Sequence, residues 1–424
     1  MNTASPRKTN GAANKLSPSD RAFHDWYRFV LSFPPHLVRI YLNRFGLNQK
    51  ATILDPFCGT GTTLVEAKLQ GIRSIGIEAN PMPCFATRVK IDWEVDPKDL
   101  VKHSEEIADA TKDCLRFWGK RDLLSLPTET FKLLLRDSIS PLPLHKTLVL
   151  LEQIHRFQDD RYFKYEALAL AKSLVFLISN LHFGPEVGVQ PTKKKDAPVV
   201  ESWLTEIKTM SLDLCNVSGK QAYTKVYNKD SRNLSSVLKP NSIDAVFTSP
   251  PYPNEKDYTR TTRLESVLLG FVRDRNDLQM LKKGLLRSNT RNVYKDDDDD
   301  KWVAENKDIQ SIARSIEEKR IRLGKTSGFE KLYGRVTKLY FGGMARHLAD
   351  LRQYLKPGAQ LGYVVGDQAS YLQVLIRTGQ LLADIAESLG YELIDIDLFR
   401  TRFATATKKQ MREEVVVLRW PGNR

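Results

Sequence analysis

A glycine-rich turn near the start of the chain reads Asp55-Pro56-Phe57-Cys58-Gly59-Thr60-Gly61-Thr62-Thr63. It follows a short apolar run at residues 50–54 and precedes residues 64–69, which have the pattern of a helix. A strand, a glycine turn and a helix in this order place backbone N–H groups and the positive end of the helix over a ligand. Glycine suits such a turn because it adopts positive φ and lets a ligand approach the backbone closely.

A second predicted strand, residues 73–77, ends at Glu78. An acidic residue about 20 positions beyond a glycine turn is placed to accept hydrogen bonds from ribose hydroxyls. The turn lacks the third glycine of the dinucleotide fingerprint, and no Gly-Lys-Ser/Thr follows as in a phosphate-binding P-loop. These features favour a nucleoside ligand whose tail carries no phosphates.

A second motif lies far downstream. The apolar run at residues 244–248 predicts a strand, and it leads directly into Ser249-Pro250-Pro251-Tyr252. Open α/β sheets bind their ligands at the carboxyl ends of strands, so this turn is also placed at a ligand site.

The two motifs together resemble those of the S-adenosylmethionine-dependent DNA amino-methyltransferases. The turn at Phe57, Gly59 and Gly61 is similar to the cofactor motif of that family, and Ser249 to Tyr252 are similar to its catalytic motif. Both occur in the family order, each at the end of an apolar strand. This combination outweighs the alternative of an unrelated α/β protein with two chance motifs. The resemblance implies an α/β fold with a Rossmann-like, doubly wound methyltransferase sheet, and S-adenosylmethionine as the cofactor.

The resemblance also implies a set of cofactor-binding residues. Glu78 corresponds to the ribose acceptor and Asp230 to the acceptor of the adenine amino group. Asp230 and Ser231 could instead cap a helix at residues 234–237, and the helix that begins near Pro35 could close over the methionine end of the cofactor or simply cover the sheet. The full predicted set is Pro35, Asp55, Pro56, Phe57, Cys58, Gly59, Thr60, Gly61, Thr62, Thr63, Glu78, Ala79, Asp230 and Ser231.

The predicted reaction methylates an exocyclic amine of a flipped DNA base. Such an amine is a poor nucleophile. Hydrogen-bond acceptors that bind its N–H groups make its lone pair more available for methyl transfer. Ser249 and the Pro250 carbonyl can supply them, Pro251 adds no competing N–H donor, and Tyr252 can stack on the base. In the family, serine at this position goes mostly with cytosine N4, and aspartate or asparagine with adenine N6. N4-methylation of cytosine is therefore expected, with adenine N6, an RNA amine or a non-catalytic DNA-binding role as alternatives.

The charge balance favours a polyanionic partner. The 424-residue chain has a net charge of +14 and a pI of about 9.4, and phosphates bind such surfaces through counterion release. Double-stranded DNA is the predicted partner, and a cognate restriction endonuclease is a further candidate. Monomer and dimer are not distinguished. The predicted DNA contacts follow the catalytic motif directly: Lys256, Tyr258, Arg260 and Arg263.

The catalytic domain is expected in three parts, at residues 20–95, 221–254 and 341–424, preceded by a disordered tail at 1–19. Residues 96–220 have the pattern of a mostly helical insertion that is a candidate for target recognition. Residues 255–340 form a basic insertion expected to contact DNA. The acidic run from Asp296 to Asp300 is expected to be a solvated loop, with a metal contact or a tag-like segment as alternatives.

The remaining elements complete a doubly wound sheet that ends in an antiparallel hairpin. Ser19-Asp20 is expected to cap a helix carrying Phe23, Trp26, Tyr27 and Val30, and residues 184–188 are expected to be a polar loop. The other predicted elements are helices at 81–89, 341–355 and 372–389, a strand that ends in Asp230, a strand at 360–365, and strands at 392–399 and 414–420 joined by the loop 400–412.

The cysteines, Cys58, Cys84, Cys114 and Cys215, form no Cys-x-x-Cys pair, so neither a zinc site nor a disulfide framework is predicted. Cys84 is interpreted as structural. A reducing, prokaryotic cytoplasm is the expected location. The most apolar run, residues 167–183, is too short and too polar for a membrane span. The basic triplet at 193–195 is expected to be a solvated loop, with phosphate contact as the alternative.

Overall fold

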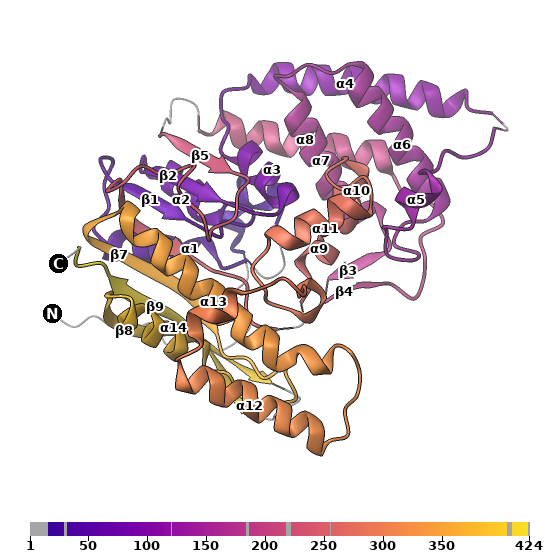
Figure 1. Ribbon diagram of the computed structural model, residues 1–424. Helices are drawn as coiled ribbons and strands as arrows, with labels where there is room; N and C mark the ends of the chain where they lie inside the picture. Colours follow the sequence, from indigo (N-terminus) through magenta and orange to yellow (C-terminus); the bar gives the residue numbers. More distant parts are fainter. Residues whose placement is uncertain are drawn as a thin grey trace.

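The computed structural model describes residues 16–28, 32–119, 121–183, 186–217, 222–254, 256–404 and 409–422. The predicted tail up to residue 15, and Val30, lie outside the described residues. One seven-stranded sheet lies on the left in Figure 1, and a group of helices extends from one side of it toward the upper right.

The sheet has the strand order β5-β2-β1-β6-β7-β9-β8. Neighbouring strands are parallel, except that β9 runs antiparallel to both β7 and β8. This arrangement confirms the doubly wound sheet with a terminal antiparallel hairpin. The strands are β1 (Thr52–Asp55), β2 (Arg73–Ile77), β5 (Thr224–Tyr227), β6 (Ile243–Thr248), β7 (Leu355–Gly366), β8 (Glu392–Ala404) and β9 (Lys409–Arg419).

Helices cover both faces of the sheet. Adjacent residues of a strand point to opposite faces, so neighbouring apolar residues pack in different layers. In β1, Ile53 packs in the same cluster as helices α1 and α2, whereas Leu54 packs with α13 and α14. In β9, Val415 packs in the same cluster as Ile53, and Val416 packs in the same cluster as Leu54. The covering helices are α1 (Pro35–Arg44), α2 (Thr62–Leu69), α13 (Tyr333–Leu351) and α14 (Thr378–Ser388), and α3 (Pro81–Lys90) follows β2.

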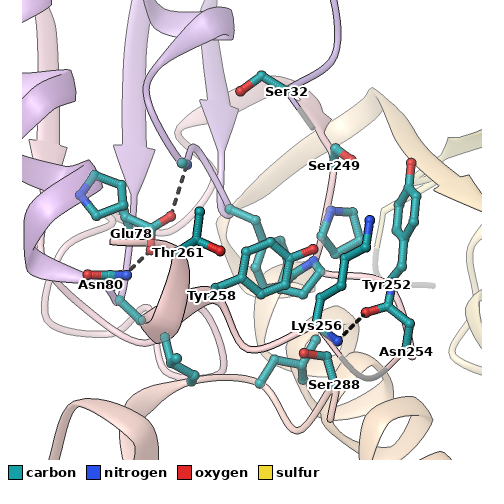
Figure 2. A pocket seen from close by; sticks show the side chains of 18 of the residues that line it. Ser32, Glu78, Asn80, Ser249, Tyr252, Asn254, Lys256, Tyr258, Thr261 and Ser288 are labelled. Carbon is teal, nitrogen blue, oxygen red and sulfur yellow. Dashed lines mark hydrogen bonds between the residues drawn. The ribbon is translucent and has the colours of Figure 1, made fainter. Parts of the chain in front are cut away.

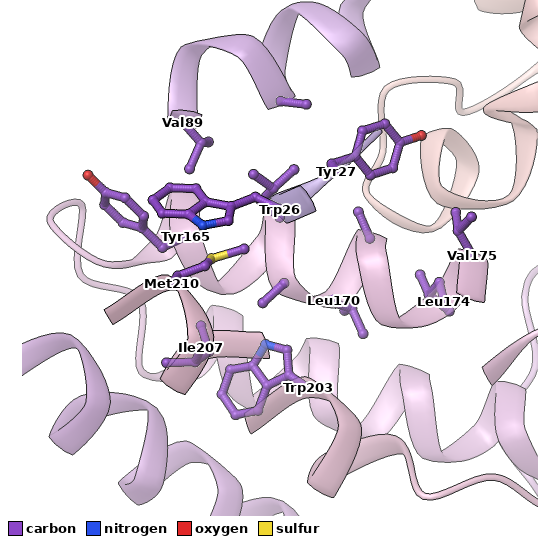
Figure 3. Close-up of a cluster of buried hydrophobic side chains, with 14 of the residues drawn as sticks. Trp26, Tyr27, Val89, Tyr165, Leu170, Leu174, Val175, Trp203, Ile207 and Met210 are labelled. Atoms are coloured by element: carbon purple, nitrogen blue, oxygen red, sulfur yellow. The ribbon is translucent and has the colours of Figure 1, made fainter. Parts of the chain in front are cut away.

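The first insertion leaves the sheet after α3 and is mostly helical, as predicted. Its helices pack on the N-terminal residues Trp26 and Tyr27 and on α3 (Figure 3). A short hairpin of β3 (Leu181–Phe183) and β4 (Val187–Val189) was not predicted. Of the polar loop expected at 184–188, residues 184 and 185 lie outside the described residues, and residues 187 and 188 belong to β4. Strands of three residues are too short to show a period. The helices are α4 (Pro97–Arg116), α5 (Thr128–Phe131), α6 (Pro141–Arg156), α7 (Phe163–Ser173) and α8 (Val199–Cys215).

The second insertion connects β6 to β7 and packs along α13. It contains α9 (Tyr258–Thr261), α10 (Arg263–Leu268), α11 (Arg275–Gly284) and α12 (Lys307–Arg322). Helix α13 begins at Tyr333, earlier than the predicted start at residue 341.

The acidic run is only partly a solvated loop, which corrects the expectation for Asp296 to Asp300: Asp296 and Asp298 are exposed, but Asp297 pairs with Arg287 and Asp299 is buried. Asp299 is 5% exposed and pairs with Arg232 and Arg346. The backbone of the run reaches α13 because Gly342 has no side chain: an added Cβ there would lie 1.9 Å from the Asp299 carbonyl oxygen. The charge pattern alone could not show that Asp299 pairs with arginines far away in the sequence.

Three predicted helices differ from the structure. Residues 20–28 form no α-helix; short 3-10 helices occur at Pro18–Asp20 and His24–Trp26, because Asp213 accepts from the Phe23 backbone N–H and the Trp26 indole. Residues 234–237 form turns instead of a helix. The helix expected at 372–389 begins only at Thr378, since Leu372 and Gln373 both have positive φ.

Some strand boundaries also differ. Strand β5 ends at Tyr227, before the predicted end at Asp230. Residues 356–358 belong to β7, although a stop to the preceding helix was expected there. Strands β8 and β9 extend into residues 400–412, which had been predicted as a loop.

The close approach at Gly342 can be tested by substitution. We expect Gly342→Ala to lower the free energy of unfolding by about 1–3 kcal/mol, because the new methyl group overlaps backbone atoms that cannot rotate away. Urea denaturation measures this change. Gly328→Ala is the matched control, since nothing lies within 4 Å of its added Cβ. Equal stability of the two variants would show that the acidic run is not held against α13.

Candidate active site

One pocket of about 540 Å³ lies where the parallel strands end. The segments that follow β1, β2, β5 and β6 all contribute to its lining, so residues far apart in the sequence meet there. Figure 2 shows Glu78 and Asn80 at one end of the view, Tyr258 near the middle, and Ser249 and Tyr252 toward the other end.

The glycine turn has the backbone that the sequence predicted. Gly59 and Gly61 have φ values of +51° and +84°, and Gly61 caps the N-terminus of α2. A Cβ on Gly61 would lie 2.8 Å from the Thr87 side chain, so glycine is needed there for space as well as for φ. At Gly59 nothing lies within 4 Å of an added Cβ, which leaves that face of the turn open.

Glu78 holds the turn and faces the pocket. Its carboxylate accepts from the backbone N–H groups of Gly59 at 2.9 Å and Asn80 at 2.7 Å. Enclosure by the protein raises the pKa of Glu78 to about 7, although these hydrogen bonds act in the opposite direction. The carboxylate oxygens retain lone pairs that could accept from hydroxyl groups of a ligand.

Asp230 lies at the same pocket and is held by a buried ion-pair chain. Arg232 Nη2 lies 2.6 Å from Asp230 Oδ2, and Arg232 Nη1 donates to Asp299 Oδ2. Arg346 Nη1 pairs with the other oxygen of Asp299 at 3.0 Å. His347 hydrogen-bonds the Ser231 carbonyl at 2.8 Å, and burial lowers the pKa of His347 to about 4. The acidic run thereby supports the segment predicted to bind the cofactor.

Most of the predicted cofactor residues line this pocket. They are Pro56, Phe57, Cys58, Gly59, Thr60, Thr62, Glu78, Ala79, Asp230 and Ser231. Asp55, Gly61, Thr63 and Pro35 are not part of the lining.

Two of the predicted residues outside the lining, Asp55 and Pro35, are buried beside it. Asp55 is fully buried and accepts from Thr248 Oγ1 at 2.6 Å, which ties the ends of β1 and β6 together; burial raises its pKa to about 6. Pro35 is buried in the first turn of α1, while Ser32 and Phe33 reach the pocket instead.

Ser249 is oriented by β7. Its hydroxyl donates to the Val364 carbonyl at 3.1 Å. A hydroxyl has one hydrogen, so this bond leaves the Ser249 oxygen to act as an acceptor in the pocket. Pro250 and Pro251 also line the pocket and carry no N–H donors.

Tyr252 packs closely on the sheet. A Cβ on Gly366 of β7 would lie 3.2 Å from Tyr252 Cε2, so the ring lies against that glycine. Burial raises the pKa of Tyr252, which keeps its hydroxyl protonated.

Three of the four predicted DNA contacts line the same pocket: Lys256, Tyr258 and Arg260. Burial lowers the pKa of Lys256, with a further contribution from Arg402. Arg263 lies outside the lining; its guanidinium donates to the Leu133 carbonyl at 3.1 Å and to Thr259. The DNA contact predicted for Arg263 stays a prediction beside this structural role.

Sequence reasoning missed several pocket residues. The β8–β9 hairpin contributes a group of them, in which Glu413 pairs with Arg400. Others come from β3–β4 and from a segment whose Ser288 carbonyl accepts from the Asn254 backbone N–H at 2.9 Å. No motif marks these positions; an asparagine-rich stretch near residue 290 was the one available signal. The missed residues include Phe183, Glu186, Val187, Asn254, Ser288, Asn292, Phe399, Arg400, Arg402 and Glu413.

Other site types are not formed by the described residues. Among them, no group of three or more His, Cys, Asp or Glu side chains is arranged to hold a metal ion. Every helix in the described part of the chain is too short or too polar to cross a lipid bilayer. Cys84 is buried, and burial raises its pKa to about 12, which makes the thiol unreactive.

Comparison with known proteins relates the chain to DNA methylases. A family model described as DNA methylase matches residues 5–85, which include the glycine turn. The Type II methyltransferase M.BsoBI of Geobacillus stearothermophilus is 26% identical over 94% of this chain and 84% of that protein. The Type II methyltransferase M.AvaI of Nostoc sp. is 25% identical over 96% of this chain and 88% of that protein.

A solved structure, TrmN from Thermus thermophilus, aligns over 94% of this chain and 52% of that chain, with 12% identity and a TM-score of 0.31. The family model spans the glycine turn, and the two relatives match over nearly the whole of this chain. In its motifs and in these matches, the chain is similar to the S-adenosylmethionine-dependent DNA amino-methyltransferases.

Proposed function

We propose that the protein transfers the methyl group of S-adenosylmethionine to the exocyclic N4 amine of cytosine in double-stranded DNA. The observation that supports this most directly is the orientation of Ser249. Its hydroxyl hydrogen is committed to Val364, so its oxygen can accept from an amine in the pocket. The carbonyl of Pro250 is the second candidate acceptor for that amine.

Acceptors are what this reaction requires. The lone pair of an exocyclic amine is conjugated into the base ring, and hydrogen bonds from both N–H groups to the protein make it more available. When bound, S-adenosylmethionine supplies a methyl group on a positively charged sulfur. The new N–C bond forms as the S–C bond breaks, and one amine proton is released to water. Ser249 and Pro250 position the amine throughout, and no covalent bond to the protein is needed.

The residues at the other end of the pocket fit a nucleoside. Glu78 has lone pairs available for ribose hydroxyls, Asp230 can accept a further hydrogen bond beside its ion pair with Arg232, and Gly59 leaves room for close approach. These residues line one continuous pocket with Ser249. A methyl donor and a base could therefore bind in it together.

A base in duplex DNA must leave the stack to reach this pocket. Tyr252 and Tyr258 offer aromatic faces there, and base–aromatic stacking contributes about 1–3 kcal/mol. Six basic side chains in the lining, balanced in part by acidic ones, suit the phosphates on each side of the base. These six are Lys229, Lys256, Arg260, Arg291, Arg400 and Arg402.

Both insertions are proposed to read the DNA target from opposite walls of the pocket. Phe183 and Val187 come from the first insertion, and Arg291 and Asn292 from the second. The relatives that the chain resembles are Type II methyltransferases. We therefore also propose a cognate restriction endonuclease as a partner.

Cytosine N4 is proposed as the methylated atom because serine occupies position 249, and in this family serine goes mostly with cytosine. Adenine N6 is the alternative. We expect N4-methylcytosine to appear in DNA from cells that express the protein. Mass spectrometry of digested nucleosides identifies the base, and methylation-sensitive sequencing gives its sequence context. N6-methyladenine alone would overturn the choice of base, and no modified base in any DNA or RNA would favour a non-catalytic role.

Ser249→Ala should slow methyl transfer and leave cofactor affinity unchanged. Loss of one acceptor aimed at the transition state typically lowers kcat about 10²–10³-fold. Single-turnover kinetics and calorimetric titration with S-adenosylmethionine separate the two effects. Ser235→Ala is the control, since Ser235 is exposed and bonds only Asn233 among the contacts that the structure describes. A wild-type rate for Ser249→Ala would remove the hydroxyl from the mechanism.

Cofactor affinity should depend on pH through Glu78. Its pKa of about 7 is raised from 4.5, so below pH 7 the carboxyl gains a proton and loses the negative charge that strengthens hydrogen bonds from ribose hydroxyls. We expect affinity to fall as pH decreases through 7, approaching about tenfold per pH unit. Calorimetry from pH 5 to 8 measures the change, and Glu78→Gln should remove it. The same dependence in Glu78→Gln would assign the titration to another group, such as Asp55.

A further inference from the structure

An apolar tip is exposed in the first insertion. Within residues 167–183, almost all apolar side chains are buried, but Phe176 and Leu177 are 45% and 44% exposed. Both belong to a π-helical turn, Leu174–Ile178, that continues α7. Such turns are rare and occur often at functional sites. We call Phe176 and Leu177 the apolar tip.

The apolar tip lies beside the pocket. The ring of Phe176 is 5.9 Å from that of Phe183, centroid to centroid. Phe183 lines the pocket, as does Val187 on the paired strand β4. The apolar tip therefore borders the wall that the first insertion contributes.

The tip has a rigid base. Leu174 and Val175 of the same turn are buried in the core of the first insertion (Figure 3). Asn180 follows the turn and is itself buried; its side-chain amide donates to the Asp137 carbonyl and to Ser140 Oγ, each at 3.0 Å. Side chains on this buried base can contact a partner without displacing the backbone that carries them.

Basic residues adjoin the tip. The Lys194 backbone N–H donates to Asn180 Oδ1 at 2.9 Å, and Lys194 Nζ donates to the Leu177 carbonyl at 2.5 Å. Lys193 and Lys195 on each side are exposed. The segment that carries the three lysines is thus fixed against the turn that carries the tip. Two exposed apolar side chains next to exposed ammonium groups match a partner with a phosphate backbone and apolar stacked bases.

We propose that the apolar tip is a wedge that enters the DNA duplex beside the target and occupies the space left by the flipped base. Lys193 and Lys195 contact the phosphates next to that position. The proposal rests on the proposed function, because it assumes a base in the pocket. Apolar side chains inserted between base steps are a general way to open a duplex, and filling the gap keeps the vacated partner base from closing it.

The test compares two DNA duplexes that contain the target sequence found by sequencing. One is fully paired, and the other has an abasic site opposite the target base, so that flipping costs little. The variant carries Phe176→Ser and Leu177→Ser together. Both side chains are exposed, so the fold should be retained, and thermal unfolding checks this. Phe117→Ser is the matched control, because Phe117 is 73% exposed on the same insertion.

We expect the double variant to lose at least about tenfold in kcat/KM on the paired duplex, about 1.4 kcal/mol. On the abasic duplex the loss should be less than about threefold, because the wedge is no longer needed to hold the base out. Fluorescence of 2-aminopurine at the target position should show less flipped base in the double variant than in wild type. Phe117→Ser should match wild type on both duplexes.

Three results would overturn the proposal. An equal loss on both duplexes would make the tip a general contact, and no loss on either would leave it outside the DNA interface. A wild-type dimer that the double substitution dissociates would assign the tip to contact between two copies of the chain. Wild-type protein that methylates neither duplex would instead refute the proposed function, so the two failures can be told apart.

Discussion

A parallel sheet must bury both of its faces, and this leaves the ends of its strands as the place where a ligand can reach the backbone. In this protein α1 and α2 cover one face, and α13 and α14 cover the other. Adjacent residues such as Ile53 and Leu54 serve opposite layers, so a shift of one position in the register would disturb both. The glycine turn, Glu78 and Ser249 all follow strands of this sheet, and their meeting in one pocket is a consequence of that geometry.

A second constraint joins the end of the pocket that is predicted to bind the cofactor to the second insertion. Arg232 is 8% exposed, and a buried guanidinium needs compensating charge. Asp230 supplies it from the segment after β5, and Asp299 supplies it from the acidic run. The approach of the run to α13 depends on Gly342. A segment whose sequence predicts a solvated loop therefore helps to support the candidate active site.

The pocket has walls from many separate parts of the chain, and this suits a reaction between two large substrates. The glycine turn and Glu78 suit a nucleoside, while Ser249 and Tyr252 suit a base. The first insertion adds Phe183, against which Phe176 packs, and the terminal hairpin adds Arg400 and Glu413. A base that enters this pocket from a duplex would pass residues of both insertions, so we infer that target recognition and methyl transfer are physically connected.

The sequence by itself determined the sheet, the two motifs and their order, because local patterns carry them: apolar runs for β1, β2 and β6, glycines for the positive φ at residues 59 and 61, and prolines for the turn after Ser249. Most of the residues that it predicted to bind the cofactor line the pocket. Only the tertiary structure decided the bonding of Ser249 to Val364, the burial of Asp299, and the contributions of Phe183 and Arg400. These depend on contacts between residues far apart in the chain, and such contacts leave no periodic signal in either segment. For the same reason Phe176 and Leu177 could not be told apart from their buried neighbours in the apolar run: exposure is a property of the packed molecule, decided by what the rest of the chain leaves uncovered.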